Sequence, residues 1–176
     1  MKFEELVTTK KGNLGEDLLD KYLESKGLVI YRPKEGKAHP FDRLCASADK
    51  RHLVIAECKT KPARLYYPDT GINVSHYEDY LYVRNHYKVN IWIYFVDEYK
   101  KMIYGNPLEK LESPRRIFHN GKEIEYPLID RGIIYFPLIA MEVVAKIDEE
   151  SALKLQQLSS RSYSYGAGEV VVDGSI

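Results

Sequence analysis

The chain has 176 residues, of which 44% are hydrophobic and 30% are charged, and its formal net charge at pH 7 is zero. This length suits one domain with a full hydrophobic core, and the neutral balance argues against a strongly basic nucleic-acid binder. No run of about 18 apolar residues is present, so no membrane span is expected.

The amino-terminal residues include acids and lack the apolar segment of a secretory signal, so we expect no export signal. The two cysteines, Cys45 and Cys58, have neither a metal-binding nor a disulfide-rich spacing. Both are therefore expected to be reduced thiols in a cytoplasmic protein.

Positive charge is concentrated in one segment of this neutral chain. Residues 32–64 hold nine basic and four acidic side chains, whereas residues 148–176 hold two basic and five acidic ones. Such a cluster is ordinarily a solvated surface, but here it also surrounds the motif described below.

The first predicted element is a helix over 14–26, with leucines on one side at helical spacing. Asn13 is expected to cap its start, with Glu16 completing a capping box. Gly12 and Gly15 beside Glu16 would allow close approach of a second backbone or of a ligand.

Three strands are predicted next, at 28–33, 41–46 and 52–59. The last two flank a short polar turn, which predicts an antiparallel hairpin. In the register that we expect, Ser47 pairs with His52.

A second helix is expected over 75–87, where Ser75 and Glu78 form another capping box. The continuous apolar run at 89–96 predicts a central strand covered on both faces. The second half of the chain predicts a strand at 101–105, a short helix at 107–112, a hairpin turning at Asn120-Gly121, a strand at 132–138 and a helix at 147–159.

This order of elements predicts an α/β fold with a mixed central sheet flanked by helices. We expect a single domain over residues 1–160, with its core at 12–97 and an elaboration at 98–160. Residues 161–176 have the composition of a linker and tail, and the apolar part of this tail is expected to dock either as a strand or against a neighbouring copy of the chain.

The second strand of the hairpin begins with apolar side chains and ends with charged ones. Because side chains alternate along a strand, Glu57 and Lys59 share a face with Ile55. In the expected register Leu44 faces Ile55 and Asp42 faces Glu57, with the Cβ atoms of the two acids roughly 5 Å apart. Facing carboxylates destabilise a sheet unless a cation lies between them, and hard divalent cations bind carboxylate oxygens.

Each acid has a simpler interpretation when it is considered alone. Asp42 could belong to a turn, Glu57 with Lys59 to a surface ladder, and Glu16 to a helix cap. The pair is harder to explain in this way, because an unpaired carboxylate in a core strand costs several kcal/mol. Asp42 and Glu57 are therefore candidate ligands of Mg²⁺ or Mn²⁺.

Glu16 on a first helix, then Asp42, then Glu57-Cys58-Lys59 together resemble the PD-(D/E)xK nuclease superfamily, which includes restriction endonucleases and archaeal Holliday junction resolvases. The 14 residues between Asp42 and Glu57 are similar to the interval in that superfamily. The expected order of helices and strands also resembles its αβββαβ core.

This resemblance implies a restriction-endonuclease-like fold and a metal-dependent nuclease. Asp42, Glu57 and the backbone carbonyl of Cys58 would hold the metal, with Glu16 as a supporting acid. Lys59 would orient the attacking water or stabilise the developing anion.

Five further residues are candidates for contacts with a substrate. Lys61, Arg64 and Tyr66 follow the motif directly, and His76 and Tyr77 open the second predicted helix. Packing within a loop or the core is the commoner role for residues of these types.

The predicted function is a Mg²⁺- or Mn²⁺-dependent endonuclease with DNA as the expected substrate. One alternative is a catalytically inactive module that keeps the fold and binds nucleic acid or a protein partner. Another is a scaffold that uses its 15 tyrosines as an interface. The neutral charge favours a homodimer that shares a DNA groove, or a subunit of a larger complex.

Overall fold

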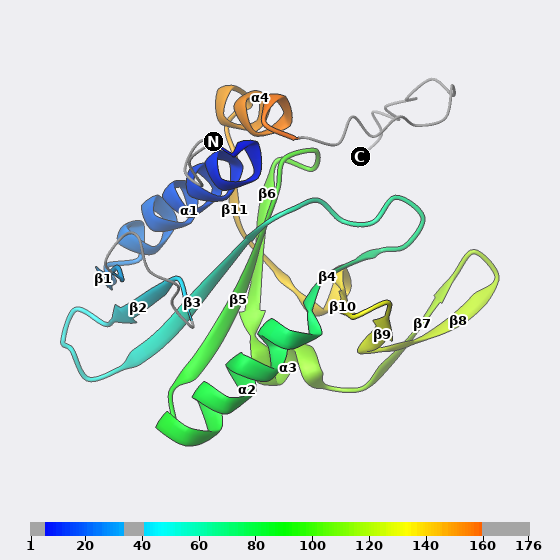
Figure 1. Cartoon of the computed structure of the whole chain (residues 1–176), viewed down its shortest axis with the longest axis horizontal. Helices are drawn as coiled ribbons and strands as arrows, with labels where there is room; N and C mark the ends of the chain where they lie inside the picture. The colour runs from blue at the N-terminus through cyan, green and yellow to red at the C-terminus, as the bar shows by residue number, and fades with distance from the viewer. Residues whose placement is uncertain (1–5, 34–40, 160–176) are drawn as a thin grey trace.

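The computed structural model describes residues 6–33 and 41–159. At its centre is a six-stranded mixed sheet in the order β1-β2-β3-β5-β6-β11 (Figure 1). These strands are β1 (Val29–Tyr31), β2 (Arg43–Ala46), β3 (Leu53–Thr60), β5 (Asn90–Asp97), β6 (Met102–Pro107) and β11 (Glu142–Lys146). The predicted mixed α/β architecture is confirmed.

In the part of the chain that the structure describes, four α-helices accompany the strands: α1 (Val7–Ser25), α2 (Val74–Tyr87), α3 (Leu108–Glu112) and α4 (Glu149–Gln157). The elements α1, β1, β2, β3, α2 and β5 follow one another in the predicted αβββαβ order, with one extra strand, β4 (Asp69–Asn73), before α2. The strand β5 pairs in parallel with β3 and antiparallel with β6, so it is central as expected.

Each face of the sheet is covered by its own hydrophobic cluster. Ile93 and Phe95 of β5 belong to the cluster beneath α2 and α3, whereas Tyr94 and Val96 belong to the cluster beneath α1 and α4. Alternation along one strand thus supplies both cores.

The second half of the chain adds two smaller sheets. The strand β4 pairs with β10 (Ile133–Pro137), which also pairs with β9 (Leu128–Asp130). The predicted hairpin is formed by β7 (Arg115–His119) and β8 (Lys122–Tyr126), which extend away from the central sheet (Figure 1). Asn120 and Gly121 at its turn both have positive φ, as such a two-residue turn requires. A short 3₁₀ helix, η2 (Leu138–Ala140), follows β10.

The predicted start of the first helix is wrong. The helix α1 begins at Val7, its N-cap is Leu6, and Asn13 lies exposed within it. Threonines and glycine are weak helix formers, but tertiary contacts compensate for them here. Lys11 in this part of α1 forms an ion pair with the buried Glu98 at 2.5 Å.

Two other local predictions are corrected by the structure. The N-cap of α2 is Asn73, with no side-chain cap hydrogen bond, so the Ser75–Glu78 capping box does not form. The edge strand β11 was not predicted, because its alternating pattern is weak. In the structure its pairing with β6 is interrupted between Val143 and Ala145. The predicted docking of the tail lies outside the described residues.

Among the described ranges, no helix is both long enough and apolar enough to cross a membrane.

Candidate active site

The hairpin of β2 and β3 has the predicted register. Leu44 pairs with Ile55 and Arg43 with Ala56, and the N–H of Ser47 donates to the carbonyl of His52 at 2.9 Å. The ladder ends at Arg43, so Asp42 lies one step beyond it, beside the last part of β3.

Asp42 and Glu57 are joined by reciprocal contacts with each other's strand. The backbone N–H of Asp42 donates to Oε2 of Glu57 at 3.0 Å, and the N–H of Cys58 donates to Oδ2 of Asp42 at 2.9 Å. Beyond the end of β2, each carboxylate therefore accepts a backbone hydrogen bond that a carbonyl of the opposite strand would accept in a regular ladder. The structure brings these two acids together at one edge of the hairpin.

Glu57 is almost fully buried, with 3% of its surface exposed. Its Oε1 accepts a hydrogen bond from Lys59 Nζ at 2.6 Å and another from the hydroxyl of Tyr80. Burial raises the pKa of Glu57 to about 7, and Asp42 adds to the rise, although Lys59 and Tyr80 oppose it. A carboxylate in this state gains strongly from an added cation.

Lys59 points inward along the same face as Glu57. Burial alone would lower the pKa of Lys59, but the attraction of Glu57 outweighs it and the net shift is upward. The ammonium also lies 5.8 Å from the centre of the Tyr80 ring. Lys59 is therefore held as a cation beside the buried acid.

Tyr80 is a member of the site that the sequence did not predict. It lies one turn after His76 and Tyr77 on α2 and is buried. Its hydroxyl donates to Glu57, and burial followed by the charge of Glu57 raises its pKa well above the usual range. The phenol therefore stays protonated and acts as a fixed donor.

Arg43 is a second residue that the sequence did not single out. Its side chain lies on the α1 face of the sheet, where it forms a two-point ion pair with Asp20, with distances of 2.9 and 3.2 Å. It also donates to the carbonyl of Asp42 at 2.8 Å and lies 2.9 Å from Oε2 of Glu16. From the α1 face of the sheet, Arg43 thus links the backbone of Asp42 to the side chain of Glu16.

Glu16 is placed near Asp42 but is engaged by Arg43. Burial and the charge of Asp42 raise the pKa of Glu16, whereas Arg43 lowers it. No three His, Cys, Asp or Glu side chains in the described residues are grouped as a ready-made metal site. A metal at this position would therefore need main-chain, water or substrate oxygens besides Asp42 and Glu57.

Cys58 contributes its backbone, while its side chain lies in the opposite cluster with Ala56. Burial raises the pKa of the Cys58 thiol well above its usual value, so it is no nucleophile. The N–H and C=O of one strand residue point to the same side, so the carbonyl of Cys58 is directed toward Asp42 as its N–H is.

Close approach of another backbone or of a ligand was predicted at Gly12 and Gly15, and within the described residues the structure shows it at Gly15 alone. An added Cβ at Gly15 would lie 1.8 Å from Oγ1 of Thr60, whereas one at Gly12 would meet nothing within 4 Å. Gly15 therefore lets α1 pack directly against the end of β3. At Gly12, by contrast, no described residue packs against the helix.

The candidate substrate contacts are dispersed. Arg64 forms an ion pair with the buried Asp69 at 2.5 Å and stacks 3.7 Å from the Tyr135 ring, so it organises its own loop. The side chain of Tyr66 is 74% exposed. The hydroxyl of Tyr77 donates to Glu112 at 2.8 Å, which anchors α2.

His76 is exposed near the start of α2, with its ring 6.5 Å from that of Tyr80. Lys61 borders a pocket beside the end of β3. Of the five candidates, His76 thus has its ring near Tyr80 of the Glu57 site, whereas Lys61 borders a separate pocket.

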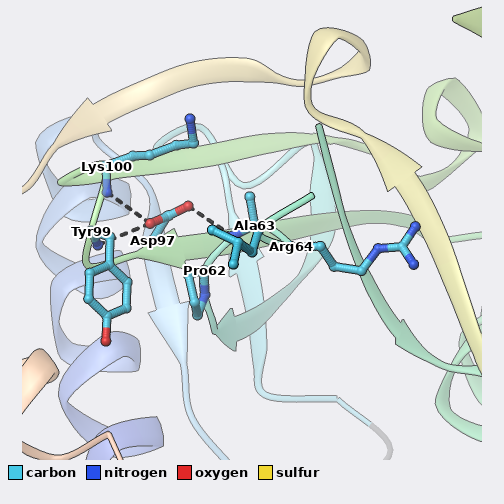
Figure 2. Close-up of a pocket in the computed structure, with 7 residues that line it drawn as sticks. Pro62, Ala63, Arg64, Asp97, Tyr99 and Lys100 are labelled. Atoms are coloured by element: carbon cyan, nitrogen blue, oxygen red, sulfur yellow. Dashed lines mark hydrogen bonds between the residues drawn. The ribbon is translucent and has the colours of Figure 1, made fainter. Parts of the chain in front are cut away.

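The segment that follows the motif is fixed by a buried acid. Figure 2 shows Asp97 at the end of β5 accepting hydrogen bonds from the backbone N–H groups of Ala63, Tyr99 and Lys100, at 2.9 to 3.0 Å. Pro62 and Arg64 border both a pocket of about 220 Å³ and a larger one of about 390 Å³. Through the N–H of Ala63, Asp97 therefore fixes the backbone between two residues that line both pockets.

No protein-family model matches the sequence, and no curated protein sequence matches it. Among solved structures, the chain is similar to Hjc, a Holliday junction resolvase from the archaeal hyperthermophile Archaeoglobus fulgidus. The match covers 81% of this chain and 99% of that chain, with a TM-score of 0.49 and 10% sequence identity. A likeness at this level carries no argument about chemistry, which has to come from the site itself.

Proposed function

We propose that the protein is a metal-dependent nuclease that hydrolyses phosphodiester bonds, with DNA as the substrate and Mg²⁺ or Mn²⁺ as the ion. The observation that carries this proposal is the reciprocal contact between Asp42 and Glu57 with Lys59 beside them. Two adjacent carboxylates and one inward lysine are a donor set suited to phosphoryl chemistry.

The donor set fits a hard divalent cation. Mg²⁺ is commonly bound by one or two carboxylates and keeps several waters, so a group of three side-chain ligands is not required. Asp42, Glu57 and the carbonyl of Cys58 would hold the ion. When bound, it would supply Lewis acidity toward the phosphate and lower the pKa of a water.

The protein's own residues then have distinct tasks. Lys59 supplies a positive charge where negative charge develops on the phosphate. Tyr80 and Lys59 fix the orientation of the Glu57 carboxylate through Oε1. Glu16 supports the site through Arg43, which also holds the backbone of Asp42.

The test compares the wild type with Glu57→Gln and Lys59→Ala on linear, nicked and branched DNA, with Mg²⁺ or Mn²⁺. We expect metal-dependent cleavage by the wild type and a loss of at least a hundredfold in both variants. Glu78→Gln, which changes an exposed glutamate on α2, serves as the matched control and should cut normally.

Equal cleavage by the wild type and Glu57→Gln would place the activity elsewhere. Binding without cleavage of any substrate would favour the alternative of an inactive nuclease-fold module.

A further inference from the structure

A pocket distinct from the Asp42 and Glu57 pair lies between the first turns of α1, the end of β3 and the strands β4 and β10. Its volume is about 390 Å³, within the range of small-ligand sites. Thr8 and Thr60 are among its lining residues, although the Thr60 hydroxyl itself is buried against Gly15 of α1.

The charged residues of this pocket are all cations. Lys11, Lys61 and Arg64 line it, and none of its described lining residues is acidic. The acids that pair with Lys11 and Arg64 are Glu98 and Asp69, which are 0% exposed and do not border the pocket. The described lining of the pocket therefore presents cationic groups and no carboxylate, although two of these cations are ion-paired with acids buried beneath it.

The start of α1 adds a second, independent source of positive potential. Thr8 belongs to the first turn of α1, and this turn contains no acidic residue. Among the described residues, no side chain makes a capping hydrogen bond at the N-cap Leu6. The first N–H groups of a helix and its dipole attract anions when no side chain caps them.

The pocket is close to the Glu57 site in two ways. Lys61 follows Lys59 by two residues, and its N–H donates to the Lys59 carbonyl at 3.1 Å, which makes a tight turn. Along α1, Thr8, Gly12 and Glu16 share one face at helical spacing, over about 12 Å. Gly12 leaves that path open, since an added Cβ there would meet nothing within 4 Å.

We propose that this pocket binds a phosphate group, namely one on the nucleic-acid strand a short distance from the bond that is cut. The identity of the strand rests on the proposed nuclease function. The choice of phosphate rests on the three cations that line the pocket and on the first N–H groups of α1, which match its charge and its acceptor oxygens.

The first test adds an acid to the pocket wall and measures the affinity for a fluorescent single-stranded DNA in EDTA, where no cleavage occurs. Thr8→Glu should bind about tenfold more weakly, because the new carboxylate repels phosphate. Its Tm should stay equal or rise, since an acid in the first turn stabilises a helix. Val7→Glu places the same acid in the same turn on an exposed residue outside the pocket, and should weaken binding less.

The second test removes one cation and follows the salt dependence of binding. Lys61→Ala should reduce the slope of log affinity against log salt by about one, as expected for one lost phosphate contact. Lys122→Ala removes an exposed lysine of the β7–β8 hairpin and should leave the slope unchanged. A general structural defect would not change the slope in this selective way.

Equal affinities for Thr8→Glu and Val7→Glu, or an unchanged slope in Lys61→Ala, would overturn the proposal. Inorganic phosphate is the second probe, followed through the amide NMR shifts of Thr8 and Thr60. Phosphate-induced shifts in a protein that neither binds nor cuts DNA would support the pocket and reject the nuclease. DNA cleavage with unaltered binding by the variants would support the nuclease and reject the pocket.

Discussion

At the scale of single residues, the central feature is a buried acid that is shared by several donors. Glu57 receives hydrogen bonds from Lys59, Tyr80 and the backbone of Asp42, yet its pKa is still raised to about 7. The donors orient the carboxylate without fully compensating for its burial. A divalent cation would supply the missing compensation.

The raised pKa of Glu57 predicts how stability depends on pH. Because the folded pKa lies above the unfolded one, the metal-free protein should lose stability as pH rises from about 4.5 to 7, by on the order of 3 kcal/mol. Glu57→Gln should remove this dependence and be more stable than the wild type at pH 8. Urea unfolding in EDTA across this range measures it, and an unchanged pH dependence in the variant would contradict the assignment.

In the proposed nuclease, Tyr80 is expected to set the charge state of Glu57. Its hydrogen bond lowers the pKa of Glu57, so Tyr80→Phe should shift the acidic limb of the cleavage rate toward higher pH and reduce the rate about tenfold. Tyr77→Phe, which loses a hydrogen bond to Glu112, is the control and should leave that limb in place. The measurement is the initial cleavage rate as a function of pH.

At the scale of elements, the packing of α1 on β3 determines where the acids and the pocket lie. Gly15 makes this contact at Thr60, and Arg43 connects the same helix to Asp42 through Asp20 and Glu16. The helix therefore has to approach closely, because a displaced α1 would separate Glu16 from the hairpin.

Two glycines of α1 should respond oppositely to the same substitution. Gly15→Ala would place its Cβ 1.8 Å from Oγ1 of Thr60, and should destabilise the fold by about 1–3 kcal/mol. The Cβ of Gly12→Ala would meet no atom of the described residues within 4 Å, and this change should stabilise the helix by about 0.5–1 kcal/mol. Chemical denaturation of the two variants tests this, and similar effects at both positions would argue against the packing of α1 on β3.

The hairpin was predictable from the sequence, whereas its supports were not. Strand alternation and the polar turn determine that Asp42 faces Glu57. The role of Arg43 could not be predicted, because its partners Asp20 and Glu16 belong to a helix distant in the sequence. They also lie on the opposite face of the sheet from Glu57. The position of Tyr80 depends on how α2 docks, which a single helical pattern does not specify.

The start of α1 shows the same limitation at the level of an element. Asn13 and Glu16 form a sound local signal for a helix start, but Lys11 is held by Glu98, which lies 87 residues away. Contacts of that separation overrode the local preference. The αβββαβ order, by contrast, follows from the periodicity of apolar residues, and the structure has the elements in this predicted order.

At the scale of the whole molecule, a metal should be linked to global stability. Because an ion that binds the folded state alone raises Tm, Mn²⁺ should stabilise the wild type, and more at pH 8 than at pH 6, where protons compete at Glu57. Asp42→Asn and Glu57→Gln should lose this increase. Thermal scans with and without Mn²⁺ decide it, and an equal shift in all three proteins would place the ion elsewhere.

The closeness of Asp42 and Glu57 along the chain also bears on how the protein reaches its fold. Only 14 residues separate them, and hairpins form on a scale of about 1–10 μs, before distant helices have docked. The two like charges therefore meet early, when neither Tyr80 nor Arg43 is yet in place to relieve them. A divalent cation bound between the two acids would relieve this repulsion while the hairpin forms, so the proposed ion would assist folding as well as chemistry.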